Sequence, residues 1–159
     1  MTEQEKPKDA EAQFRLGSAY MDGEMSVPNN ETEAIYGVPG DEAKALFWWT
    51  KAAEQGYTEA MLKLGDFYEY GGEYIDGDEV KAAYWYTKAA EKGYAHAQYL
   101  LGYCYESGEG VAADKTKAVY WYNKAAEQGH EYAKENRDRL IKTSEEDFFR
   151  FKINKDAEW

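Results

Sequence analysis

The side chains that could perform chemistry are few and scattered along this chain of 159 residues. The two histidines, His96 and His130, occupy different positions of the sequence pattern described below and lack the spacing of metal ligands. The single cysteine, Cys104, follows a tyrosine in a helical pattern, which favours a small buried residue over a nucleophile. The segment DGD at 76–78 lacks the ligand run and closing Glu of a calcium loop, so we expect a turn and a helix cap there. The sequence therefore predicts no catalytic activity, no metal and no cofactor.

Composition and charge indicate a folded protein whose partners are other proteins. A net charge of −12 would repel phosphates, so we expect no binding to nucleic acid. Aromatic residues make up 16% of the chain, which is too many for a disordered protein. Residues 1–12 are charged and lack the apolar stretch of a secretory signal, and no apolar run approaches the length of a membrane span. Together with the lone thiol, these features predict a cytoplasmic protein that does not enter a membrane.

Three copies of a two-part pattern organise the chain. The second part reads KALFWWTKAAEQG at 44–56, KAAYWYTKAAEKG at 81–93 and KAVYWYNKAAEQG at 117–129, and an Asp precedes each copy. The first part, Ala-x3-Leu-Gly-x2-Tyr, begins at Ala12, Ala60 and Ala97. Because Asp is a good helix N-cap and Gly commonly follows a helix, each repeat is expected to form two helices. The Gly inside the first helix would allow close approach of a neighbouring helix.

Each second helix carries three consecutive aromatic residues, at 47–49, 84–86 and 120–122. Successive side chains on a helix point about 100° apart, so three adjacent rings cannot share one buried face. A helix lying between its own first helix and the next repeat could still give each ring a neighbour. We therefore predict a structural role for all nine rings, with Trp121→Ala costing several kcal/mol of stability, on the order of other core aromatic deletions.

The Leu-Gly-x2-Tyr box, the aromatic triplet and the Lys-Ala-Ala-Glu-x-Gly ending closely resemble the Sel1-like repeat (SLR) family, a relative of the tetratricopeptide repeats. The resemblance covers roughly residues 10–140. It implies an all-α, right-handed solenoid of stacked helix-turn-helix repeats that binds proteins and has no catalytic activity. On this basis we expect one solenoid over 1–143, with repeats at about 9–56, 57–93 and 94–129 and a capping helix at 130–143, followed by a C-terminal extension at 144–159.

An insertion of 11 to 12 residues separates the two helices of the first repeat, compared with the spacing in the other two. It contains two of the three prolines and several turn formers. One interpretation is an ordinary surface loop, and the other is a binding loop whose contact residues would be Ile35, Tyr36 and Val38.

The C-terminal segment is unlike a linker. Phe149, Phe151 and Ile153 alternate with basic residues, which is a strand-like pattern. Two alternatives are an extension helix that packs on the last repeat and an exposed arm. Before it, Asn136 to Arg139 replace the Leu-Gly-x2-Tyr box, which is typical of the polar outer face of a terminal capping helix.

The resemblance also predicts where a partner would bind, because the first helices line the concave face in tetratricopeptide-like stacks. The corresponding positions mix carboxylates with apolar and aromatic side chains: Glu11, Phe14, Ser18 and Met21; Glu59, Leu62, Asp66 and Glu69; His96, Tyr99, Tyr103 and Glu106. Residues 1–93 contain 9 basic and 19 acidic side chains and so carry ten of the twelve net negative charges. A basic protein partner is therefore expected to be attracted to the first two repeats.

Two functional hypotheses follow. In the first, the protein is a cytosolic bacterial immunity or adaptor protein that neutralises or chaperones one toxin or effector. In the second, it is a regulatory scaffold module in a signalling or envelope-associated complex. In both, the chain is expected to be a monomer or a weak homo-oligomer.

Overall fold

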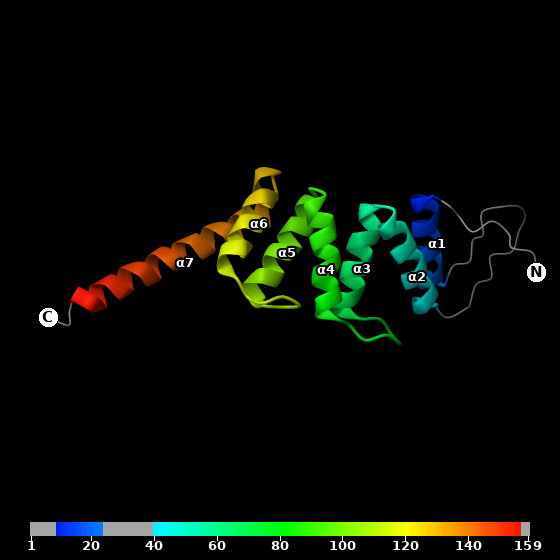
Figure 1. The fold of residues 1–159 in the computed structure, drawn as a ribbon, viewed down its shortest axis with the longest axis horizontal. Helices are drawn as coiled ribbons and strands as arrows, with labels where there is room; N and C mark the ends of the chain where they lie inside the picture. The colour runs from blue at the N-terminus through cyan, green and yellow to red at the C-terminus, as the bar shows by residue number, and fades with distance from the viewer. Residues whose placement is uncertain (1–8, 24–39, 157–159) are drawn as a thin grey trace, which may run out of the picture. The chain divides into compact units, whose positions relative to one another are not determined.

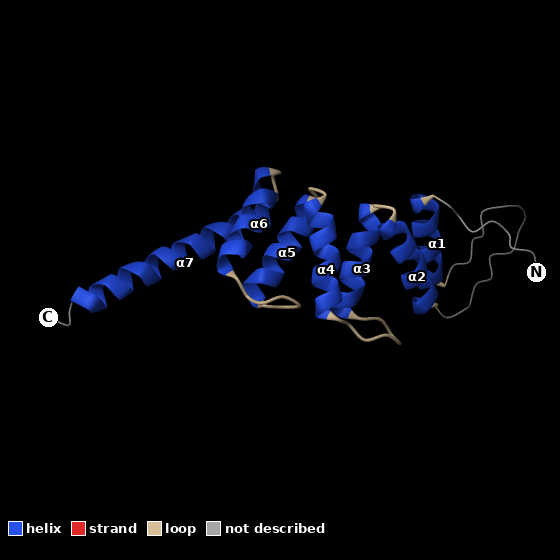
Figure 2. Ribbon diagram, viewed as in Figure 1, coloured by secondary structure: helices blue, strands red, loops and turns tan. Residues whose placement is uncertain are grey.

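The computed structural model describes residues 9–23 and 40–156, and within them helices are the only regular secondary structure (Figures 1 and 2). The elements are α1 (Ala10–Asp22), α2 (Glu42–Glu54), α3 (Thr58–Tyr70), α4 (Glu79–Glu91), α5 (Ala95–Ser107), α6 (Lys115–Glu127) and α7 (Glu131–Asp156). The predicted all-α arrangement of stacked helix pairs is confirmed. No helix in the described part of the chain combines the length and the apolarity needed to cross a bilayer.

The helix boundaries lie where the capping residues predict them. The carboxylates of Asp41, Asp78 and Asp114 each accept a hydrogen bond from the backbone N–H three residues later, at 2.9, 3.1 and 3.0 Å. The glycines that end the second helices have φ values of 90°, 93° and 87°, in the order Gly56, Gly93 and Gly129. A left-handed backbone conformation is one that glycine adopts without a steric penalty, so these positions stop the helices.

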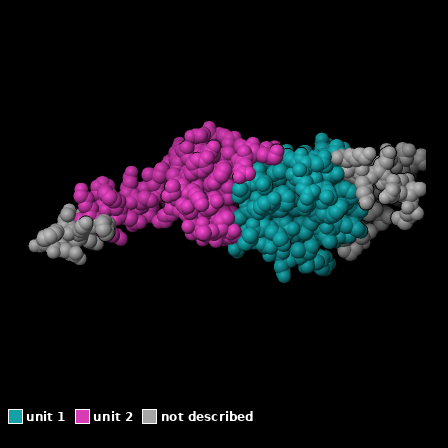
Figure 3. Space-filling view, in the orientation of Figure 1, with its two compact units in different colours: residues 1–89 teal, residues 90–159 magenta. Residues whose placement is uncertain are grey.

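The chain folds as two compact units, residues 1–89 and 90–159, which are coloured separately in Figure 3. In the first unit, α1 packs on α2 and α2 packs on α3. In the second unit, α6 packs on both α5 and α7. The core of the second unit contains Ala118, Tyr122, Ala125, Ala133 and Leu140.

The third ring of each aromatic triplet explains the glycine of the first helix. A Cβ placed on Gly17 would lie 2.6 Å from Cδ1 of Trp49, and one on Gly102 would lie 2.6 Å from Cδ1 of Tyr122. Gly65 is covered in the same way by the third ring of the second triplet. The close approach predicted at these glycines is therefore made by an aromatic ring of the paired helix. These rings are among the most buried large side chains of the molecule.

The first ring of each triplet behaves differently. Phe47, Tyr84 and Tyr120 are 51%, 53% and 52% exposed. In each case the ammonium group of the lysine four residues later lies over the ring, 5.8, 5.5 and 5.2 Å from its centroid. Each of these rings also contacts the adjacent tryptophan edge to face at 5.1 Å. Both contacts are to residues of the ring's own helix, and about half of each ring is exposed.

The C-terminal segment continues α7 as a helix to Asp156, although its residues alternate as in a strand. Whether this helix packs on the last repeat stays a prediction. Leu140 is buried, whereas Phe148 and Phe149 are 63% and 61% exposed. The side chains of Phe151 and Ile153 lie outside the part that the structure describes. In the view of Figure 1 the second half of α7 extends beyond α6.

Candidate protein-binding surface

The two most exposed of the predicted contact residues in the first unit are carboxylates. Glu11 on α1 and Glu59 on α3 occupy the same repeat position, and both are exposed. Glu11 forms an ion pair of 2.5 Å with Arg15 one turn later, with both side chains more than half exposed. Such an exposed pair contributes little to folding stability. Glu11 and Glu59 are both accessible to a partner because their side chains are exposed.

The apolar predicted residues of the first unit are half-buried. The Phe14 ring lies 5.2 Å from the ring of Tyr57, the residue just before α3. Leu62 and Met21 are also half-buried. These three side chains are therefore shared between the interior and the surface.

The other predicted acids of the first unit have an internal role. The hydroxyl of Tyr86 contacts Oδ1 of Asp66 at 3.0 Å and Oε2 of Glu69 at 2.5 Å. Burial, and next the hydrogen bond to Glu69, raise the pKa of the Tyr86 phenol. In the first repeat the same arrangement joins Trp49 Nε1 to Ser18 Oγ at 3.2 Å. Asp66, Glu69 and Ser18 thus satisfy the polar end of a buried ring, which competes with the predicted contact to a partner.

Glu106 plays the corresponding role in the second unit. Its Oε2 accepts a hydrogen bond from the Tyr122 hydroxyl at 2.8 Å, and its Oε1 pairs with Nη2 of Arg139 at 2.6 Å. Burial, followed by this hydrogen bond, raises the pKa of Tyr122. Arg139, on α7, therefore links the capping helix to the ring that fills the repeat core.

A stack of rings that the sequence analysis missed forms on the second unit. His96 and Tyr99 were predicted contact residues, and both lie against His130: Nδ1 of His96 is 3.4 Å from Nε2 of His130, and the Tyr99 and His130 rings stack at 4.6 Å. Burial, and then the charge of His96, lower the pKa of His130. The pattern did contain a signal, because an aromatic residue follows each closing glycine: Tyr57, Tyr94 and His130.

The remaining predicted contact residues fall into two groups. Tyr103 is 41% exposed, and its hydroxyl lies 3.4 Å from Oε1 of Glu109 in the following turn. The proposed loop contacts Ile35, Tyr36 and Val38 lie outside the described residues. Among the predicted contact residues that the structure describes, Glu11, Glu59, His96 and Tyr103 are exposed.

A buried carboxylate in the first unit was also missed. Glu42 is only 7% exposed, and it accepts hydrogen bonds from the backbone N–H groups of Glu73, Tyr74 and Ile75, the last at 2.9 Å. Three converging N–H groups compensate the burial of a charge. This contact anchors the loop between α3 and α4 to α2. The equivalent residues in the next two repeats are Glu79 and Lys115, so the contact cannot be read from the repeat pattern.

Within residues 9–23 and 40–156, no group of three or more His, Cys, Asp or Glu side chains is placed to hold a metal ion. Cys104 is buried. The geometry thus offers exposed carboxylates, half-buried apolar groups and stacked rings, which are suited to contacts with another protein.

The comparisons with known proteins identify the repeats. The family model for the Sel1 repeat matches residues 10–36, 35–57, 58–94 and 95–130. The chain therefore belongs to the Sel1 repeat (SLR) family, whose repeats typically serve protein–protein interaction. The first repeat is matched in two separate pieces, residues 10–36 and 35–57, and the insertion lies in the region where they meet. No curated protein matches this chain.

The solved structures that are similar to it include the following three. A Sel1 repeat protein from Oxalobacter formigenes is 37% identical with a TM-score of 0.65, and the match covers 82% of this chain and 89% of that one. The protective antigen c5321 of uropathogenic Escherichia coli, which has an SLR fold, is 42% identical with a TM-score of 0.63; 79% of this chain matches 24% of the antigen. Cysteine-rich protein B of Helicobacter pylori is 30% identical with a TM-score of 0.55, over 77% and 90% of the two chains.

Proposed function

We propose that this protein is a non-catalytic binding module that captures one basic protein through the exposed face of the first helices of its first unit. The observation that carries the proposal is the pair of exposed carboxylates at the same position of α1 and α3, Glu11 and Glu59. Apolar side chains lie one turn away from each, Phe14 and Leu62. Such a surface suits a Lys or Arg flanked by hydrophobic residues.

The internal pairing of charges supports the same surface. Within the described part of the first unit, the ion pairs join residues three or four apart on one helix or at its cap. They neutralise basic side chains locally and leave the acidic excess of residues 1–93 in place. A surface of one sign raises the association rate with a partner of the opposite sign and does so less at high salt.

The biological role we favour is that of a cytosolic bacterial immunity or adaptor protein for a toxin or effector. A small acidic repeat protein would cover the basic surface of one such partner and keep it inactive or soluble. The partner is a protein and neither a nucleic acid nor a membrane, because the acidic surface repels anionic phosphates. The predicted loop contacts Ile35, Tyr36 and Val38 would add apolar area to the same interface.

A regulatory scaffold is the second candidate. It is favoured by the match to the Escherichia coli antigen, a longer chain with an SLR fold of which the match covers 24%. A scaffold would bind several clients with micromolar affinity, whereas an immunity or adaptor protein would hold one partner tightly.

The decisive experiment is affinity capture from a lysate of the source organism with three purified proteins. They are the wild type, the double variant Glu11→Lys/Glu59→Lys, and the control Glu127→Lys/Glu135→Lys, which changes the charge equally at exposed positions of the second unit. We expect one near-stoichiometric basic protein with the wild type and the control, and its loss with the first-unit variant.

Each other outcome has a clear meaning. Equal recovery with all three proteins would reject the first-unit surface. Recovery of several weakly held proteins would favour the scaffold. A toxin-like reading frame beside the gene, whose product is inactivated on co-expression, would support the immunity role, and unaltered toxicity would reject it.

A further inference from the structure

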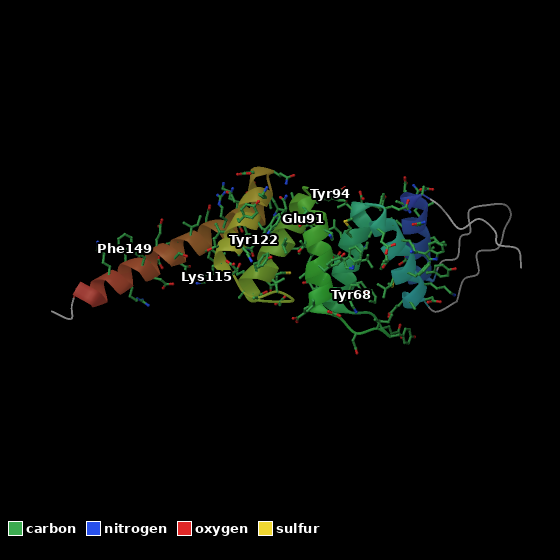
Figure 4. All side chains as sticks on the ribbon, in the orientation of Figure 1. Tyr68, Glu91, Tyr94, Lys115, Tyr122 and Phe149 are labelled. Carbon is green, nitrogen blue, oxygen red and sulfur yellow. The ribbon has the colours of Figure 1, made fainter. Side chains whose placement is uncertain are left out.

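An apolar groove runs between α6 and the second half of α7, separate from the surface proposed above. Its volume is about 720 Å³, and it is lined by Lys115, Thr116 and Val119 of α6 and by Ile141, Ser144, Glu145, Phe148 and Phe149 of α7. Figure 4 labels Lys115 near the start of α6 and Phe149 on α7. A second hollow of about 440 Å³ shares Thr116, Val119 and Ile141 with it and extends along the same two helices.

The two phenyl rings beside this groove are mostly exposed. Phe148 and Phe149 are 63% and 61% exposed, and Ile141 is 41% exposed. The two phenyl rings contact each other edge to face at 6.0 Å. Adjacent exposed apolar side chains beside a groove are a common feature of protein interfaces.

The outer face of α6 shows the same incomplete burial. Val119 is partly buried, as is Leu46 at the same position of α2, whereas the smaller Ala83 of α4 is 1% exposed. On α7, Asp138 stands where α3 and α5 have the glycine that receives a ring. The last helix pair therefore ends the repeat pattern with apolar surface left over.

The charges on α7 are ordered along the helix and indicate what covers this surface. Glu145, Glu146 and Asp147 precede the two phenylalanines, and Arg150 and Lys152 follow them; all five side chains are exposed. A helix with this order complements a second copy of itself running in the opposite direction. In such a pair, the acidic block of each helix faces the basic block of the other.

We propose that the second half of α7 is a self-association surface, at which two copies of this chain pair in antiparallel fashion around Phe148 and Phe149. Glu145, Phe148 and Lys152 follow the spacing of three and four residues that keeps side chains on one face of a helix. With the two-fold axis between Phe148 and Phe149, Glu145 lies opposite Lys152 of the second copy. The phenyl rings of each copy enter the apolar groove region of the other.

The same charge order disfavours other occupants. An anionic lipid surface would attract Arg150 and Lys152 and repel the acidic block from Glu145 to Asp147. A uniformly basic protein would be repelled by the residues that follow the rings. A second copy satisfies both blocks at once, because a two-fold axis brings each acidic block against a basic one.

The test is sedimentation velocity of the full chain over a concentration series from low micromolar to submillimolar. We expect a reversible monomer–dimer equilibrium, weakened by salt. Phe148→Ser/Phe149→Ser should abolish dimerisation while the helical circular dichroism is kept. A chain that remains monomeric throughout the series would overturn the proposal, as would dimerisation unaffected by this variant.

Exchanging the charges of Glu145 and Lys152 tests the pairing geometry separately from the stability of the fold. Glu145→Lys alone, and Lys152→Glu alone, should each raise the dimer dissociation constant by about tenfold or more, because two pairs per dimer become repulsive. Mixing the two single variants should form a heterodimer, since each then supplies the charge that the other needs. The control Glu135→Lys, on the same helix before the groove, should dimerise as the wild type does.

Two results would reject the antiparallel geometry. One is an equimolar mixture of the single variants that stays as monomeric as its components. The other is a Glu145→Lys variant that dimerises as well as Glu135→Lys. Neither result bears on the first-unit surface, because capture of a basic partner is read out separately.

Discussion

The two units contain the same helix pair, yet they stabilise their buried polar groups differently. In the first unit, two carboxylates hold the Tyr86 hydroxyl, and Glu42 is enclosed by backbone N–H groups of the following loop. In the second unit, one carboxylate holds Tyr122, and an arginine of α7 pairs with its other oxygen. At the position of Glu42 the second unit has Lys115, which lines the open groove. The repeat core is thus constant, and the polar groups around it specialise each unit.

Each unit has the same kind of core, and the largest loss of stability is expected at the third ring of an aromatic triplet. Tyr122 has no exposed surface, so Tyr122→Ala should lower the free energy of unfolding by about 3–5 kcal/mol, as deletion of other buried aromatic rings does. Tyr120→Ala is the matched control, because its ring is 52% exposed, and it should cost less than about 1 kcal/mol. Urea denaturation followed by circular dichroism measures both. Equal losses would show that the position within the triplet does not decide the role of the ring.

A smaller effect is expected from the glycine beneath that ring. Gly102→Ala would place a Cβ 2.6 Å from Cδ1 of Tyr122, so the buried ring must move, at a cost of about 1–3 kcal/mol despite the better helix propensity of alanine. In the background of Tyr122→Ala the same change should be neutral or stabilising. The double-mutant cycle from urea denaturation measures this coupling. A coupling energy near zero would contradict the proposed contact.

The contact that distinguishes the first unit can be removed by Glu42→Gln. The amide retains one acceptor oxygen and turns a donor toward backbone N–H groups, so we expect a loss of about 1–3 kcal/mol. Glu79→Gln is the control, since Glu79 has the equivalent position in the next repeat and is exposed. It should change stability by less than about 0.5 kcal/mol. Hydrogen exchange at residues 73–75 should accelerate in Glu42→Gln alone; unchanged exchange there would refute the anchoring role.

The smallest expected effect is a pH dependence of the second unit. The pKa of His130 is lowered in the folded protein, so the unfolded chain binds the proton more readily. Folding stability from this group is therefore full above the ordinary histidine pKa of about 6.5 and decreases as the pH falls below it. His130→Tyr introduces the residue found at this position in the earlier repeats and removes the titration. The melting temperature of the variant should fall less than that of the wild type between about pH 7 and pH 5; parallel curves would contradict this.

Much of the fold was predictable because its signals are local. Asp caps and closing glycines act through backbone groups within three residues, so repetition of the pattern was enough to place the helices. The role of each ring in a triplet could not be predicted from the sequence, because the packing of the paired helix determines which of the three adjacent rings lies over a glycine. The strand-like alternation at the C-terminus was overridden by continuation of α7.

The candidate site was predictable only in part. The family resemblance selected Asp66, Glu69 and Glu106 as contacts for a partner, but it could not show that tyrosine hydroxyls bind these carboxylates. The pairing of His96 with His130 joins residues 34 positions apart and depends on the stacking of two repeats. Glu11 and Glu59 remain a prediction as partner contacts.

The most direct test of the account is the salt dependence of partner binding, measured by calorimetry with the captured protein. If the acidic first unit recruits a basic partner, the affinity should decrease steadily as salt increases, because exposed charges are screened. The slope should be shallower for Glu11→Lys/Glu59→Lys than for the wild type, and unchanged for Glu127→Lys/Glu135→Lys. An affinity that is constant from low to high salt, or equal in the wild type and the first-unit variant, would contradict the account.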